Sequence, residues 1–309
     1  MKRPNIVVIG SATVDLINRL PRLPKEGETV TGGVFSTAPG GKGANQAVAA
    51  VRAGANVCFV GKVGNDDYGR KSLEAYEREG INARYVSIDE SSATGIGVIF
   101  VLPSGQNAIG VALGANMKLT PEDVQKAEHE IENSDLVLFQ LETPIETVTY
   151  GVELASKYGK RVVLNPAPAQ KVEPGLLKHC SVITPNESET EMLTDIALDG
   201  ESSMVSAVKA LEAMGAGSVV LTLGSRGVYV HDPSFRGFVK AHEVVAVDAT
   251  AAGDVFSGTL AVALAEGMTF ESAVRFANAA AGLSVTQLGA QPSIPRRGEI
   301  ERFLHERRA

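Results

Sequence analysis

The sequence predicts an α/β protein built on a mostly parallel central sheet. Short, continuous apolar runs such as NIVVI at 5–9 are typical of buried strands. Stretches with helical spacing of apolar residues alternate with these runs, which is the order expected of parallel strands joined by helices. With 309 residues, of which 44% are hydrophobic and 21% charged, the chain can bury a large core as one domain or as two small ones.

The composition favours small-molecule ligands. Lys and Arg total 29 against 36 Asp and Glu, a net charge of -7, and no basic tract is long enough to indicate nucleic-acid binding. The two cysteines, Cys58 and Cys180, argue against a disulfide framework and fit a reducing compartment. The apolar run at 6–9 is too short for a signal peptide or a membrane span. We therefore expect a soluble cytoplasmic protein.

Strands and helices alternate through the first half of the chain, and two hairpins interrupt them. The elements expected there are a strand at 5–9, a hairpin within 16–35, a helix that follows the glycines of 38–43 and ends at Gly54, a strand at 57–60, a helix at 67–78, a strand at 85–88 and a hairpin at 95–111. Prolines and glycines between the β-type runs of 16–35 favour a hairpin that stands off the main sheet.

The second hairpin has an unusual first arm. Its two runs flank a Pro-Ser-Gly turn at 103–105, and the arm from Ile96 to Leu102 is apolar on both faces. Both faces therefore need cover, one from the active site and the other from a partner subunit.

The second half of the chain continues the alternation. The expected strands are at 135–139, 162–164, 182–183 and 219–223, and the expected helices follow Thr143, run from Asn186 to Leu193, begin at 251, span 271–286 and span 297–306. Thr143, Pro144 and Glu146 form a capping-box pattern with proline at the first helical position. The prolines of NPAPA at 165–169 forbid a helix directly after the strand at 162–164.

An acidic turn that runs into a long apolar helix at 247–267 forms the centre of the predicted site. Ala251, Ala252 and Gly253 carry almost no side chain, so a ligand can approach the free amides at the helix start. The helix dipole favours phosphate there, and Asp254 in the same turn can deprotonate a hydroxyl that attacks the phosphate. This pattern predicts phosphoryl transfer. The alternative is that Asp254 only stabilises the start of the helix.

Asp15 is a second candidate, in the loop GSATVDL that follows the strand at 5–9. Ligands gather at the carboxyl ends of parallel strands, where this carboxylate could hydrogen-bond two sugar hydroxyls or could equally fix a turn. The chain has no Walker A or GxGxxG motif, which argues against P-loop and Rossmann proteins. Its five histidines lack zinc-type spacing, and it has no GxSxG elbow.

Two stretches resemble the signatures of the ribokinase family of sugar kinases. They are the AAGD turn within 247–267 and GGKGAN at 40–45, and the likeness extends from GSATVD to GAQPS. The resemblance implies a single three-layer α/β/α domain over 1–309, with a small β-sheet lid formed by 13–37 and 93–112 that also makes a homodimer. It further implies a cytoplasmic enzyme that uses ATP to phosphorylate the 5-hydroxyl of D-ribose, giving ribose 5-phosphate.

The resemblance also implies roles for single positions. Asp254 matches the base, and the amides of Ala251, Ala252 and Gly253 match the anion hole. The implied sugar contacts are Thr13, Asp15, Gly41, Lys42, Asn45, Glu142 and Asp254. The implied nucleotide contacts are Asn186, Thr222, Leu223, Gly224, Ser225, Arg226, Gly227, Gly253 and Asn278. The implied ligands of a monovalent cation such as K⁺, mostly through backbone oxygens, are Asp248, Thr250, Ser284, Gln287, Gly289 and Ser293. Glu189, in the NxxE motif, matches an indirect Mg²⁺ site.

Taken alone, several of these positions allow a plainer interpretation. Asn186 fits a helix cap, and 222–227 fits a tight turn. Lys42 fits a solvated loop lysine and Glu142 a loop carboxylate.

Two positions depart from the family pattern. Ala249 stands where relatives usually have Thr, Ser, Val or Pro, which leaves the AAGD core intact. Thr13 stands where the family has the Asn of GSxNxD, and a hydroxyl cannot offer the donor and acceptor pair of an amide. Two alternatives therefore stay open: a kinase of the same family for 2-deoxyribose or another pentose or ketose, and a noncatalytic sugar-binding protein on the same scaffold.

Overall fold

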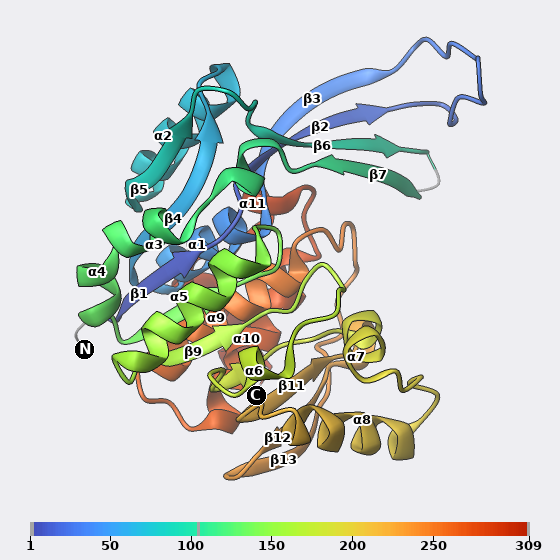
Figure 1. Ribbon diagram of the computed structural model, residues 1–309. Coiled ribbons are helices and arrows are strands. Elements are labelled where there is room, and N and C mark those ends of the chain that lie inside the picture. The colour runs from blue at the N-terminus through green and yellow to red at the C-terminus, as the bar shows by residue number, and fades with distance from the viewer. Residues whose placement is uncertain (1–2, 104–105, 308–309) are drawn as a thin grey trace.

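The computed structural model describes residues 3–103 and 106–307 and contains a nine-stranded sheet with helices on both faces (Figure 1). In spatial order its strands are β13 (Phe235–Val239), β12 (Val228–Asp232), β11 (Ser218–Thr222), β10 (Val182–Ile183), β9 (Arg161–Leu164), β8 (Leu136–Phe139), β1 (Asn5–Ile9), β4 (Asn56–Gly64) and β5 (Asn82–Asp89). The strands from β5 to β11 pair in parallel, which confirms the predicted sheet. An antiparallel pair, β12 and β13, extends one edge and was not predicted.

The helices divide between the two faces of this sheet. They are α1 (Lys42–Ala53), α2 (Asp67–Glu79), α3 (Pro121–Lys126), α4 (Glu128–Glu132), α5 (Ile145–Lys157), α6 (Pro174–Leu177), α7 (Glu187–Thr194), α8 (Glu201–Ala213), α9 (Ala252–Ala265), α10 (Phe270–Ser284), α11 (Ala290–Ser293) and α12 (Arg297–Glu306). Alternate residues of β1 enter different cores. Ile6 and Val8 pack with α1, α9, α10 and α12, whereas Val7 and Ile9 pack with α3, α4, α5 and α8. The predicted three layers are confirmed.

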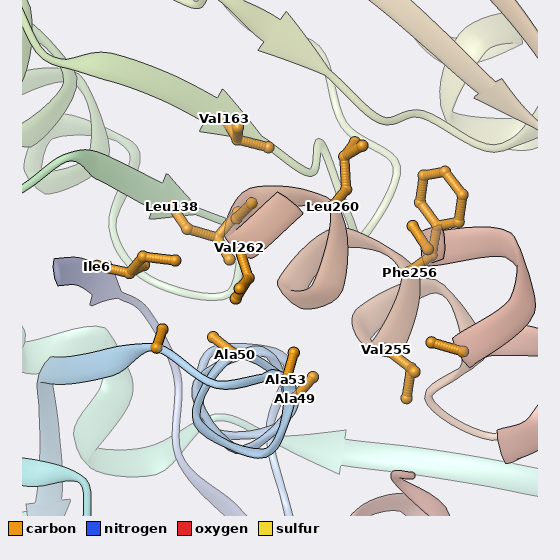
Figure 2. Close-up of a cluster of buried hydrophobic side chains, with 14 of the residues drawn as sticks. Ile6, Ala49, Ala50, Ala53, Leu138, Val163, Val255, Phe256, Leu260 and Val262 are labelled. Atoms are coloured by element: carbon orange, nitrogen blue, oxygen red, sulfur yellow. The ribbon is translucent and has the colours of Figure 1, made fainter. Parts of the chain in front are cut away.

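Helix α9 is the most enclosed helix of the first core. Its sequence, AGDVFSGTLAVALA, is apolar on nearly every side, and the helix is buried from Asp254 to Leu264. Figure 2 shows side chains of α9 lying between those of the strands and the alanines of α1. The two helices approach closely at Gly258, where an added Cβ would lie 2.6 Å from the carbonyl oxygen of Gln46. The start of α9 is therefore held rigidly against the start of α1.

A second, four-stranded sheet stands apart from the main sheet (Figure 1). Its order is β3 (Val34–Gly40), β2 (Thr13–Arg19), β6 (Gly95–Val101) and β7 (Asn107–Ala112). Each predicted hairpin is present as an antiparallel pair, and parallel pairing of β2 with β6 joins the two hairpins. Ser104 and Gly105, in the predicted turn of the second hairpin, lie outside the described residues.

The predicted capping box at Thr143 is wrong. Helix α5 begins at Ile145 with Pro144 as the capping residue, and no side chain caps it. Thr143 is instead buried, and its hydroxyl has no hydrogen-bond partner in the described structure. The chain enters α5 from the interior, so burial of Thr143 prevails over its capping preference. Helices α3, α4, α6 and α8 were not predicted.

The described residues include no helix that is both long enough and apolar enough to cross a membrane.

The close contact at Gly258 gives a stability prediction. In Gly258→Ala, the added Cβ would also lie 2.7 Å from Ala49 Cβ, so α1 and α9 must separate. We expect a loss of about 1–3 kcal/mol in the free energy of unfolding, measured with urea, because overpacking a tight core costs that much. Gly298→Ala in α12 is the control, since a Cβ there meets no atom within 4 Å. Equal stabilities of the two variants would contradict the close contact.

Candidate active site

The candidate site lies where the strand order of the main sheet reverses, between β1 and β8. The sheet grows from β1 towards β4 and β5 on one side and from β8 towards β11 on the other. Loops after β1 and β8 diverge at such a point and leave a crevice at the carboxyl ends of the strands. Here the two loops are tied together, because Ser11 Oγ donates to Glu142 Oε2 at 2.5 Å.

Glu142 also closes the start of α1. Its Oε2 accepts from the backbone amide of Lys42 at 3.0 Å, at a helix start where Gly41 offers no capping side chain. Gly41 has φ of 90°, and an added Cβ would lie 2.7 Å from the Thr13 amide nitrogen. The GGKGAN turn thus packs directly on the loop after β1, and the glycine allows that approach. Both of these hydrogen bonds use Oε2 of Glu142, which gives this residue a structural role beside the predicted one.

Asp254 lies in the first turn of α9 and points towards α1. Its Oδ2 accepts from Asn45 Nδ2 and its Oδ1 from Gln46 Nε2, both at 3.0 Å. No side chain caps α9, and Ala251 adopts the left-handed conformation with φ of 62° at the capping position. Asp254 therefore does not act as the cap of its own helix, in contrast to the simpler alternative. The amides at this helix start are thus not capped by a side chain, as the predicted anion site requires.

Burial and nearby charges set the protonation of the site. Burial raises the pKa of Asp254, while Lys42 and the amides of Asn45 and Gln46 oppose this rise. Burial alone would lower the pKa of Lys42, but the carboxylates of Asp254, Glu142 and Glu189 outweigh it and raise that pKa. Lys42 is thus a charged partner of three carboxylates, not a solvated loop lysine. An Asp with a raised pKa is a stronger proton acceptor than an exposed one.

Asp15 adds another carboxylate from the small sheet. Its side chain lies over glycines of both neighbouring strands: an added Cβ at Gly40 or Gly97 would lie 2.6 or 2.8 Å from its Oδ1. Burial, followed by repulsion from Glu142 and Asp254, raises its pKa to about 6. Thr13 is on the same face of β2, buried, with its methyl group next to Gly95. The structure therefore brings the predicted sugar contacts together in one cluster of polar side chains, in which Asp15, Lys42, Glu142 and Asp254 interact electrostatically.

A cleft of about 790 Å³ lies on the other side of the α9 start. The predicted nucleotide contacts that line it are Asn186, Thr222, Gly224, Ser225, Gly227, Gly253 and Asn278. Leu223 and Arg226 are not among its lining residues. Leu223 is buried beside Leu221 and Met204, and Arg226 forms an ion pair with Glu187.

Asn186 and Glu189 form a closed pair. Asn186 caps α7 by accepting from the Glu189 amide at 2.8 Å, and Glu189 accepts from both the backbone and the side chain of Asn186. The cap interpretation is therefore correct for Asn186, which also lines the cleft. Glu189 is buried, and burial raises its pKa.

The predicted cation ligands fall on two loops that Asp248 joins. Its Oδ1 accepts from the backbone and hydroxyl of Thr250, and its Oδ2 accepts from the amide of Gly289 at 2.8 Å. The hydroxyls of Ser284 and Ser293 donate to carbonyls within their own helices. The backbone amide of Gln287 donates to the Ser284 carbonyl. The side chains of Asp248, Ser284 and Ser293 are thus engaged in hydrogen bonds within these segments.

Sequence reasoning missed the amides that surround Asp254. Gln46 follows Asn45 on α1, Gln140 follows β8 and Asn165 follows β9, and all three are buried. Asn116 was also missed; it fixes the loop after β1 by bonding both the amide and the carbonyl of Ala12 at 2.8 Å. A signal existed for Gln140 and Asn165, because each is a polar residue at the carboxyl end of a buried strand.

Comparisons with known proteins agree with this geometry. Residues 3–297 match the model of the family described as pfkB family carbohydrate kinase. The chain is 43% identical to the ribokinase of Haemophilus influenzae, over 98% of this chain and 99% of that protein. It is 37% identical to the deoxyribokinase of Salmonella typhimurium, over 97% of both. The structure of Arabidopsis thaliana ribokinase complexed with ribose and ATP has a TM-score of 0.90 and 32% identity, over 98% of this chain and 99% of that one.

The fold and site define a kinase that acts on a carbohydrate. The chain belongs to the pfkB family of carbohydrate kinases. It is therefore an enzyme, and the noncatalytic sugar-binding alternative is set aside.

The burial of Asp15 and the carboxylates near it lead to a prediction on how stability depends on pH. The pKa of Asp15 is about 6 in the folded protein against an ordinary 3.8, so wild-type stability falls as pH rises between these values. Asp15→Asn has no such titration. We expect the variant to be more stable than wild type by about 1–3 kcal/mol above pH 6, with the difference vanishing near pH 4. Urea unfolding across this range measures it, and a difference that does not change with pH would contradict the shifted pKa.

Proposed function

We propose that the protein is an ATP-dependent kinase that phosphorylates the 5-hydroxyl of D-ribose. One observation carries the proposal: Gly253 lines the cleft, while the adjoining Asp254 carboxylate accepts a hydrogen bond from Asn45 in the polar cluster. A nucleotide in the cleft and a sugar against the polar cluster would therefore meet at the start of α9. The relatives named ribokinase and the complex with ribose and ATP support this pairing of substrates.

The residues present account for the steps of phosphoryl transfer. Asp15 and Asn45 would orient the sugar, and Asp254 would accept the proton of its hydroxyl as that oxygen attacks the γ-phosphorus. The amides at the start of α9 would stabilise negative charge on the transferred group, with the proton on Asp254 and ADP as the leaving group. Lys42 would offset the charge of the surrounding carboxylates.

Two ions complete the proposal. Mg²⁺, held through water near Glu189 and by the phosphates, would neutralise phosphate charge when bound. A monovalent cation such as K⁺ would lie against the carbonyls of the loops that Asp248 joins. We also place the protein in the cytoplasm, since Cys58 and Cys180 are both free and buried.

Thr13 keeps 2-deoxyribose open as the alternative substrate. A site built to pair a hydroxyl rejects the deoxy sugar strongly, and Thr13 replaces the amide expected there. The likeness to a deoxyribokinase supports testing this sugar. D-ribose remains the proposed substrate because the other predicted sugar contacts gather in one polar cluster.

A panel of sugars tests the function. We expect ADP release from ATP to be fastest with D-ribose, compared by kcat/KM with 2-deoxyribose and other pentoses and ketoses. In Asp254→Asn, kcat should fall roughly 100- to 10,000-fold while calorimetry shows sugar and ATP still bound, because only proton transfer is lost. A preference for 2-deoxyribose would overturn the sugar assignment, and a variant within about threefold of wild type would overturn the base.

We further propose that the chain is one domain and that the small sheet, over 13–37 and 93–112, is a lid that also forms a homodimer. Alternation along the strands puts Asp15 on one face of the small sheet, on the side of Glu142 and Asp254. Leu16, Val98 and Phe100 point from the opposite face, and Phe35 in the same row is 62% exposed. An apolar face of this kind on an otherwise acidic protein suits contact with a second copy.

A charge in the middle of that face should break the dimer. We expect light scattering at micromolar concentration to give a dimer for wild type and a monomer for Phe100→Asp, since a buried, unpaired carboxylate is costly. Ile88→Asp is the control, because Ile88 is an exposed apolar residue on β5, outside the small sheet. A monomeric wild type would show that the face is covered in some other way.

A further inference from the structure

Gln46 is the residue that connects Asp254 to the central sheet. Its side chain is completely buried. Its Nε2 donates to Asp254 Oδ1 and to Asn165 Oδ1, both at 3.0 Å, and its Oε1 accepts from Gln140 Nε2 at 2.6 Å. Asn165 in turn donates to the carbonyl of Thr184 at 3.0 Å. The carboxylate is thus tied through one amide to residues that follow β8, β9 and β10.

The direction of every bond in this chain follows from the charge of Asp254. An ionised carboxylate can only accept, so Gln46 must present its NH₂ group to Asp254 and its carbonyl oxygen to Gln140. The two oxygens of Asp254 then differ. Oδ1 accepts from the buried network through Gln46, whereas Oδ2 accepts from Asn45, whose own Oδ1 is buried without a hydrogen-bond partner in the described structure. Because Asn45 is a predicted sugar contact, Oδ2 is the oxygen on the side proposed for the sugar.

We infer that Gln46 is a positioning residue, which holds Oδ1 of Asp254 so that Oδ2 is aimed at the hydroxyl to be deprotonated. The inference rests on the proposed function, in which Asp254 is the base. Without this hydrogen bond the carboxylate group could rotate and populate several orientations. Misplacement of a reacting group by about 1 Å can cost 100-fold in rate.

The backbone leaves space for this amide network at two glycines. An added Cβ at Gly10 would lie 1.9 Å from Gln140 Oε1, and one at Gly258 would lie 2.6 Å from the Gln46 carbonyl oxygen. A side chain at Gly10 would displace the Gln140 amide, and one at Gly258 would push away the backbone of α1 that carries Gln46. The network therefore has room only because the loop after β1 and the middle of α9 lack side chains there.

The charges around Asp254 explain why an amide suits position 46. Lys42 from α1 is the cation that faces Asp254, and Glu142, Asp15 and Glu189 from three other elements are anions. The Gln46 hydrogen bond lowers the pKa of Asp254 without adding charge. A lysine in its place would pair with Asp254 and weaken the base, and a carboxylic acid would compete for the proton.

The test separates positioning from simple packing. Gln46→Met keeps the length and burial of the side chain but removes the donor, so the pKa of Asp254 should rise. The acid limb of the kcat against pH profile should then move to higher pH, and kcat at neutral pH should fall roughly 10- to 100-fold with little change in either KM. Gln46→Asn, which retracts the amide by one methylene, should move the limb in the same direction and serves if the Met variant does not fold.

Ser257→Ala is the matched control. Ser257 is also buried on α9, and its hydroxyl bonds Thr184 Oγ1 at 2.9 Å instead of the Asp254 carboxylate. We expect this variant to lose stability without moving the acid limb. If the limb stays in place in both Gln46 variants while Asp254→Asn is inactive, Gln46 only packs and the inference is wrong. If Asp254→Asn keeps its activity, the assignment of Asp254 as the base, on which this inference rests, has failed.

Discussion

The packing of α1 against α9 is the contact on which the site depends. Each helix brings half of the chemistry: α1 carries Lys42, Asn45 and Gln46, and α9 carries Asp254. Asp254 and Gly258 are one turn apart and so lie on the same face of α9. The glycine lets the helices meet closely enough for two amides of α1 to reach the carboxylate. In the proposed mechanism, core packing and catalytic geometry therefore depend on the same contact between helices.

Much of this arrangement could be predicted from the sequence, because local patterns decide it. Apolar runs located the strands, and Gly54 located the end of α1. The features that were missed or wrongly predicted are set by contacts between residues far apart in the chain. Parallel pairing of β2 with β6 joins segments about eighty residues apart along the chain, and no local pattern encodes it. Thr143 has the form of a cap yet is buried, since tertiary packing outweighed its local preference.

The candidate site shows the same division. Asp254, Asn45 and Asp15 stand in short motifs and could be found. Gln46 sits inside an alanine-rich helix, where a single amide reads as an ordinary helical residue. Its importance comes from Asn165 and Gln140, which directly follow β9 and β8. Only the fold brings them within hydrogen-bonding distance of Gln46. Residues that act through another residue are hidden from motif reasoning for this reason.

The first turn of α9 separates two environments within three residues. Ala252 and Gly253 line the cleft, and Asp254 turns to Asn45 and Gln46 of α1. In the proposed mechanism, backbone amides at the helix start would attract an anion on the cleft side, while a carboxylate with a raised pKa would accept a proton on the other side. Small side chains are required on the cleft side, since bulk there would keep a phosphate from the amides. The left-handed Ala251 lies directly before these residues, at the capping position of α9, so one short turn would serve both proposed roles.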